Sequence, residues 1–249
     1  MANYVEYQDP TDTSASPSPV IWGDCPVNEI IGKGTGVYQF EDFVSGGDIM
    51  ADAGPVGVFL DAGSTIVYSN EVNGAIVATH DGDAADDSIT IFGAPAFQIA
   101  QGSGSLWFEA RVKFSTVAAD QAGWFVGLTD ATAPTVIIPL TAASALSDHN
   151  TVGFHKPEEN STAFDTSYKA NGVTAVEVNS DVGTLAAATY IKLGMKFDTK
   201  DNVLSFYING AKQAATKTIP AALGTDFPND VALKFAMTIV AEAAAANTL

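Results

Sequence analysis

The sequence predicts an all-β protein, an antiparallel two-sheet sandwich with an extended N-terminal arm. Three observations predict it: segments in which apolar and polar residues alternate, Asn-Gly turns between such segments, and few helix signals. Successive strand side chains point to opposite faces of a sheet, so each alternating segment predicts a strand with one buried face. Because these apolar faces need cover, we expect two sheets packed against each other.

Residues 1–35 are predicted to form the N-terminal arm. Its stretch 9–19 is rich in Asp, Thr, Ser and Pro, a composition that favours an extended chain over a helix. Tyr4, Val5 and Tyr7 precede this stretch and are predicted to contact a neighbouring subunit. The alternative is a loosely held chain end. No basic start followed by an apolar segment marks a secretory signal.

Residues 36–240 are predicted to form the sandwich domain, and 241–249 a short helix or frayed tail. The clearest alternation predicts strands over 106–114, 191–197, 204–208 and 233–239. Shorter strands are expected at 36–43, 56–60, 64–68, 75–79, 88–92, 124–129, 150–154, 162–169 and 174–178. Asn171-Gly172 and Asn209-Gly210 predict tight hairpin turns, because both central residues of such turns need positive φ.

The composition excludes several partners. The 249 residues include 29 acidic and 11 basic side chains, a net charge of −18. Nucleic acid and anionic membrane surfaces need clustered Lys and Arg, so neither is an expected partner. No apolar run has the length of a membrane-spanning helix. Cys25 is the only cysteine, which leaves no disulfide framework and no cysteine-based zinc site.

An acidic loop is the one metal candidate in the sequence. Asp81, Asp83, Asp86 and Asp87 lie in a turn-rich segment, and calcium prefers several carboxylate oxygens from such a loop. No glutamate follows at the bidentate position of an EF-hand, so a solvated acidic loop is the favoured interpretation. No other cofactor is expected.

No catalytic residue is predicted. A glycosidase on a sandwich needs two carboxylates that flank the scissile bond. The strand over 106–114 instead offers Glu109 followed by two cations, Arg111 and Lys113. We expect these three side chains to form a cross-strand charge ladder with Lys192 and Lys196 on the solvent face of the sheet.

Five segments carry a family resemblance: 106–114, 123–129, 152–154, 190–198 and 204–210. In pattern and order they resemble the strands of the concanavalin A-like lectin/glucanase sandwich. More narrowly, the chain resembles virion structural proteins of tailed bacteriophages that carry this jelly-roll domain, in which an aromatic-acidic strand similar to 38–43 precedes the sandwich. Such sandwiches usually close with a further strand after the segment resembling 232–240, so the resemblance implies an edge completed from elsewhere.

The resemblance also implies a role. It suggests a non-enzymatic decoration or cement protein on the capsid surface, made in the host cytoplasm. Its partners would be the major capsid protein and copies of itself, with a trimer expected. The alternative is a carbohydrate-binding virion module in which Trp107, Trp124 or Tyr207 stacks on a glycan, although core packing or a subunit contact suits these positions better. A glucanase is the third reading.

Overall fold

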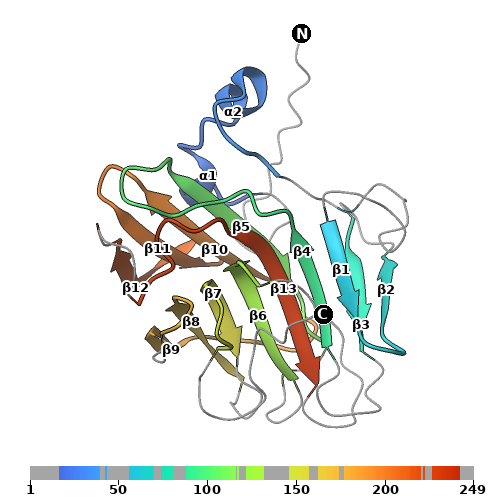
Figure 1. Cartoon of the computed structure of the whole chain (residues 1–249). Coiled ribbons are helices and arrows are strands. Elements are labelled where there is room, and N and C mark those ends of the chain that lie inside the picture. The colour runs from blue at the N-terminus through green and yellow to red at the C-terminus, as the bar shows by residue number, and fades with distance from the viewer. Residues whose placement is uncertain are drawn as a thin grey trace.

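The computed structural model describes residues 17–39, 43, 56–69, 74–80, 88–115, 117, 122–131, 146–156, 162–173, 177–219, 221 and 226–241. Over these residues the chain forms the predicted all-β sandwich, in which two antiparallel sheets face each other (Figure 1). One sheet has the strand order β1-β4-β13-β6-β7-β8-β9, and the other has the order β12-β11-β10-β5. A separate hairpin, β2-β3, lies beside β1.

The strands lie close to their predicted positions. In the larger sheet and the hairpin they are β1 Val56–Leu60, β2 Thr65–Tyr68, β3 Ile76–Thr79, β4 Ser88–Gly93, β6 Ala122–Thr129, β7 Thr151–Lys156, β8 Ala163–Lys169, β9 Glu177–Thr184 and β13 Lys234–Ala241. In the smaller sheet they are β5 Leu106–Val112, β10 Ile191–Asp198, β11 Val203–Ile208 and β12 Ala211–Thr218. The alternation predicted these strands because each has one face in the core.

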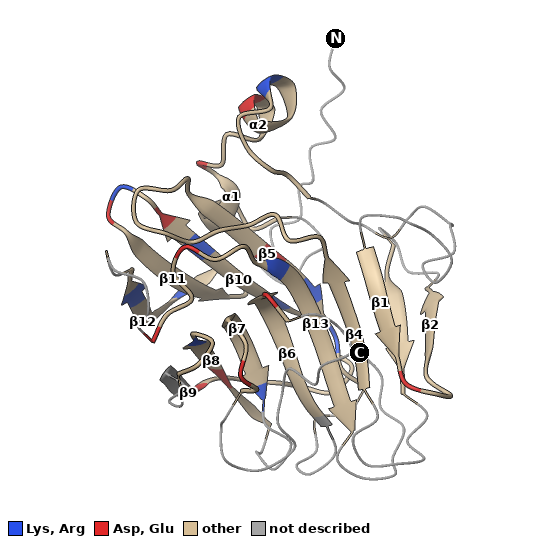
Figure 2. Ribbon diagram, in the orientation of Figure 1, with Lys and Arg blue, Asp and Glu red and all other residues tan. Residues whose placement is uncertain are grey.

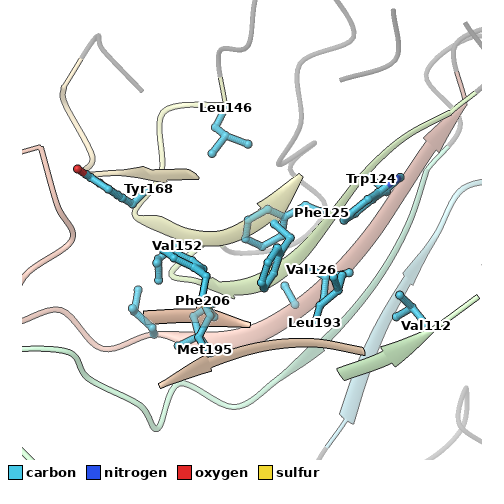
Figure 3. Packing of buried hydrophobic residues seen from close by; sticks show 14 of the residues in the cluster. Val112, Trp124, Phe125, Val126, Leu146, Val152, Tyr168, Leu193, Met195 and Phe206 are labelled. Atoms are coloured by element: carbon cyan, nitrogen blue, oxygen red, sulfur yellow. The ribbon is translucent and has the colours of Figure 1, made fainter. Parts of the chain in front are cut away.

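The core fills the space between the two sheets (Figure 3). Phe154 of β7 meets Phe206 of β11 across this space, with ring centroids 5.6 Å apart. Trp124 of β6 packs on Phe164 of β8 at 5.4 Å, and Leu193 of β10 is fully buried. These large apolar side chains account for much of the stabilisation, because each contributes roughly 1.5–3 kcal/mol when buried.

The last strand, β13, corrects one expectation. The resemblance implied an edge left open after the segment 232–240. Instead, β13 lies inside the larger sheet and pairs antiparallel with β4 on one side and β6 on the other. Ile239, for example, lies opposite Ile89 of β4 and Trp124 of β6. The segment itself therefore closes the sheet, and beside it no strand position stands empty.

The N-terminal segment differs from the predicted extended arm over its described residues. It contains two short helices, α1 Pro19–Trp22 and α2 Val27–Lys33. Helix α1 begins with Pro at its first position, where the missing N–H costs nothing. Helix α1 lies against β5 and β10, whereas α2 projects away from the sheets (Figure 1). No helix among the described residues is long and apolar enough to cross a membrane.

The described residues of the predicted strand 36–43 do not form a strand. Residues 36–39 lie in irregular structure, and Val37 and Tyr38 are exposed. Without a neighbouring strand to pair with, alternation alone does not make a strand. The two predicted turns are confirmed at their glycines: Gly172 and Gly210 have φ of 79° and 76°, and Asn209 has φ of 49°.

Candidate functional site

Glu109 is the centre of a polar contact between the N-terminal segment and the smaller sheet. It projects from β5 on the face opposite the core, and its side chain is only 7% exposed. Its Oε2 accepts hydrogen bonds from the Ser18 backbone N–H at 2.9 Å and from Trp22 Nε1 at 2.8 Å. The Ser18 hydroxyl donates to its Oε1, and Lys192 Nζ lies 3.9 Å from the same oxygen. One carboxylate thus holds both ends of α1.

Asp24 makes a second polar contact at the end of the same segment. Its Oδ1 accepts a hydrogen bond from Trp107 Nε1 at 3.0 Å, and its Oδ2 lies 2.5 Å from Lys196 Nζ. The hydrogen bond from Lys196 holds the pKa of Asp24 below its usual value, because the ammonium group favours the carboxylate. Asp24 is therefore ionised at neutral pH and paired with a cation of β10.

An apolar contact lies between these two. Ile21 of α1 is 1% exposed and rests on Gly194 of β10. A Cβ at position 194 would lie 2.3 Å from Ile21 Cδ1, so only glycine leaves room for this side chain. Glu109, Gly194 and Lys196, together with Trp107 and Lys192, form a fitted seat for residues 18–24, which we call the α1 seat.

The α1 seat corrects the predicted charge ladder. Basic residues do gather on β5 and β10, as Figure 2 shows, and Arg111 lies opposite Lys192. Glu109, however, lies opposite Gly194 and is buried under α1, and Lys192 is only 3% exposed. Arg111 stacks over the Tyr190 ring at 3.4 Å from its centroid. This part of the face packs against the chain's own N-terminal segment and is not a solvent face.

A second polar group, the His155 cluster, lies on the larger sheet. His155 of β7, Asp165 and Ser167 of β8, and Thr151 of β7 are all buried. They point away from the inter-sheet core, because His155 alternates with Phe154, which packs into that core. Ser167 Oγ lies 2.9 Å from His155 Nδ1, and Asp165 Oδ1 accepts a hydrogen bond from the Asp181 N–H at 2.8 Å.

The electrostatics of the His155 cluster favour neutral side chains. Burial lowers the pKa of His155 from 6.5 to about 4, so the imidazole is neutral at pH 7. Burial also raises the pKa of Asp165 above its usual value. A serine beside a histidine can form part of a nucleophilic pair when a third group orients the ring. Here the printed partner of Asp165 is Asp181, and Ser167 is 1% exposed. The arrangement supports packing more than chemistry.

The predicted site residues lie outside the described residues. This holds for the calcium candidates Asp81, Asp83, Asp86 and Asp87, and for the arm residues Tyr4, Val5 and Tyr7. Within the described part of the chain, no three His, Cys, Asp or Glu side chains are grouped closely enough to hold a metal ion.

The aromatic candidates follow the packing interpretation. Trp124 is 1% exposed in the core, and Tyr207 is buried on the outer side of β11. Trp107 is half-buried, and its ring N–H is bonded to Asp24.

Sequence reasoning missed the contacts of Ser18, Trp22 and Asp24. Ser18 followed by Pro19 is a helix-start signal that could have located α1. The Ser18 hydroxyl does not cap the helix, however, but donates to Glu109. A partner 91 residues away in the sequence cannot be inferred from a local pattern.

No protein-family model matches this sequence, and no curated protein sequence matches it. Solved structures do match the fold. The carbohydrate recognition domain of Emp46p in its potassium-bound form aligns with a TM-score of 0.53 at 8% identity, over 84% of this chain and 91% of that domain. The Emp47p carbohydrate recognition domain aligns at 0.52 and 10% identity, over 83% and 89%. A protein of unknown function from Shewanella oneidensis MR-1 aligns at 0.50 and 14% identity, over 90% of both chains.

These likenesses define the class of fold. The chain is a concanavalin A-like sandwich, as the resemblance in sequence pattern implied. At identities this low the likeness concerns the fold alone, because one fold carries many functions.

Proposed function

We propose that this protein is a non-enzymatic structural component of a bacteriophage particle, a decoration protein on the capsid surface. Support comes from the resemblance of its strand segments to phage virion proteins that carry this sandwich. The net charge of −18 suits a protein that stays soluble until it docks on a basic surface. Its partners would be the major capsid protein and further copies of itself, in symmetric multimers such as trimers.

The observation that carries the proposal is the α1 seat. The strand face that would present an active-site carboxylate pair in a glucanase holds Glu109, and this carboxylate is bonded to Ser18 and Trp22. The face therefore anchors the root of the N-terminal segment. Residues that precede Ser18 leave the sandwich from a fixed point, which is the geometry required of an arm that reaches a neighbouring subunit.

Particle binding tests this proposal. Full-length protein and a variant that lacks residues 1–16 would be added to purified particles stripped of the protein, and occupancy would be measured after sedimentation. Removal of 1–16 spares Ser18 and the α1 seat, so we expect an unchanged circular dichroism spectrum and lower occupancy. Full occupancy by the shortened protein would contradict the arm. No binding by the full-length protein would contradict the decoration role.

The alternative is a carbohydrate-binding virion module, and the likeness to the Emp46p and Emp47p carbohydrate recognition domains favours it. This function would require an exposed ligand face. The described positions on the outer face of the larger sheet, among them Phe125 and Thr129, are instead buried. A glycan array separates the two functions: binding that a chelator abolishes supports the lectin and the calcium candidates, and the absence of turnover on β-glucans dismisses a glucanase.

A further inference from the structure

Helix α2 is amphipathic, but it has no core of its own to pack against. Val27, Ile30 and Ile31 are spaced three and four residues apart, so they share one side of the helix. Asn28, Glu29, Gly32 and Lys33 occupy the other side. None of the seven residues is buried, and Ile31 is 61% exposed. The apolar side of α2 therefore faces solvent and not the sandwich.

The helix is too short to be stable by itself. Isolated helices shorter than about 12–15 residues are marginal in water, and α2 has seven residues. Its local supports are a left-handed C-cap at Gly34 and an exposed Glu29–Lys33 ion pair at 3.3 Å, worth about 0.3–0.5 kcal/mol. Packing of its apolar side against another surface would supply the missing stabilisation.

Further apolar side chains surround this helix. The large hydrophobic side chains that are exposed among the described residues are Val20, Ile31, Val37 and Tyr38, together with Val67 of β2. Four of these five belong to residues 20–38, and we call Val20, Ile30, Ile31, Val37 and Tyr38 the N-terminal apolar surface. A patch of this kind marks an interaction site more often than isolated exposed residues do. The α1 seat fixes its root, so the surface is presented in one orientation.

We propose that the N-terminal apolar surface is the contact through which copies of this chain associate, with the same surface of a second copy as its occupant. Copies that each carry a charge of −18 repel one another, so they can meet only where apolar area is present and local charge is balanced. Helix α2 fulfils both conditions, because its single acidic and single basic residue neutralise each other (Figure 2). This inference rests on the function proposed above for its expectation of several copies, and it identifies the surface that joins them.

Sedimentation velocity of the full-length protein over a range of concentrations tests the contact. The variant Ile31→Lys places a charge in the surface, and Val67→Lys is its matched control, since Val67 is 55% exposed on the separate hairpin. We expect the wild type and Val67→Lys to associate alike, and Ile31→Lys to need at least about tenfold higher concentration. A wild type that stays monomeric throughout, or an Ile31→Lys protein that associates like the wild type, would overturn the proposal.

Cys25 offers a second readout beside α2. It is the only cysteine of the chain and is half-buried. A short bis-maleimide cross-linker should join two wild-type copies through Cys25, and Ile31→Lys should abolish the cross-linked dimer while Cys25 still reacts with a single maleimide. Both readouts use free protein. Association in solution without particle binding would therefore contradict the decoration role and leave this contact standing, and particle binding by a strictly monomeric chain would do the reverse.

Discussion

Glu109 shows how one residue can reverse the meaning of a strand face. Its alternation with apolar neighbours places it correctly on the face away from the core, yet its carboxylate is 7% exposed and accepts hydrogen bonds from Ser18 and Trp22. Hydrogen bonds to a charged group contribute about 1.5–3 kcal/mol each, which is more than neutral pairs contribute. The burial of this charge is compatible with folding because donors of α1 replace water.

The variant Glu109→Gln is expected to loosen α1. One carboxylate oxygen becomes an NH₂ group that cannot accept a hydrogen bond, so a donor of Ser18 or Trp22 loses its partner. We expect the free energy of unfolding in urea to fall by about 1–3 kcal/mol, with a red shift of tryptophan fluorescence below the transition. The control Glu29→Gln removes an exposed ion pair and should cost less than about 0.5 kcal/mol. Equal losses in both variants would contradict a special role for Glu109.

His155 gives a pH dependence with a definite sign. Its pKa is about 4 in the folded protein and 6.5 when unperturbed, so the unfolded state binds more protons between these values. Stability should therefore decrease as the pH falls from about 6.5 towards 4, by roughly 3 kcal/mol from this residue. The raised pKa of Asp165 acts in the opposite direction, because that carboxyl stabilises the fold when protonated.

The slope of unfolding free energy against pH measures this effect. In His155→Gln the part of the slope due to the imidazole should disappear, whatever the absolute stability of the variant. In His149→Gln, which changes a partly exposed histidine outside the His155 cluster, the slope should remain steeper than in His155→Gln. Parallel curves for the wild type and His155→Gln would show that His155 is not the titrating group.

At the scale of elements, the strands could be predicted from sequence but their neighbours could not. The alternation over 191–197 and 204–208 predicts β10 and β11, and Asn209-Gly210 predicts the turn into β12, because these signals are local. The pairing of β13 with β4 and β6 joins residues more than a hundred positions apart, and no local pattern encodes it. For the same reason α1 could be expected from its proline, but not its position on Glu109.

A proline in β13 tests its interior position. Thr238 lies between Thr90 of β4 and Phe125 of β6, and its hydroxyl is bonded to that of Thr90 at 3.0 Å. Thr238→Pro removes a donor from a strand paired on both sides, so we expect loss of cooperative unfolding or of soluble protein. The matched variant Gln213→Pro lies in the edge strand β12 beside a register irregularity and should remain folded. A folded Thr238→Pro with native stability would contradict the observed strand order.

At the scale of the whole molecule, charge and apolar contact act against each other. A net charge of −18 keeps copies apart in dilute salt, whereas the N-terminal apolar surface draws them together. Salt screens the first effect and leaves the second, because the Debye length falls from roughly 30 Å at about 0.01 M to roughly 3 Å at about 1 M. We therefore expect association to strengthen with added salt.

Sedimentation at several concentrations of sodium chloride measures this. The wild type should associate at lower protein concentration as salt rises, and Ile31→Lys should respond less. Weaker association at high salt would instead indicate an interface of ion pairs, and would contradict an apolar contact between copies.

The interior position of β13 also orders the maturation of the protein in time. Strands β1 and β4 form one part of the larger sheet and β6 to β9 form the other, and β13 alone joins them. As a ribosome releases the chain, the hydrogen-bonding edges of β4 and β6 remain open until residues 234–241 emerge. Each unfinished chain thus carries two unpaired edges that nascent chains on the same message could pair with. Rapid completion of synthesis, or a chaperone that covers these edges, protects the yield of a protein needed in many copies.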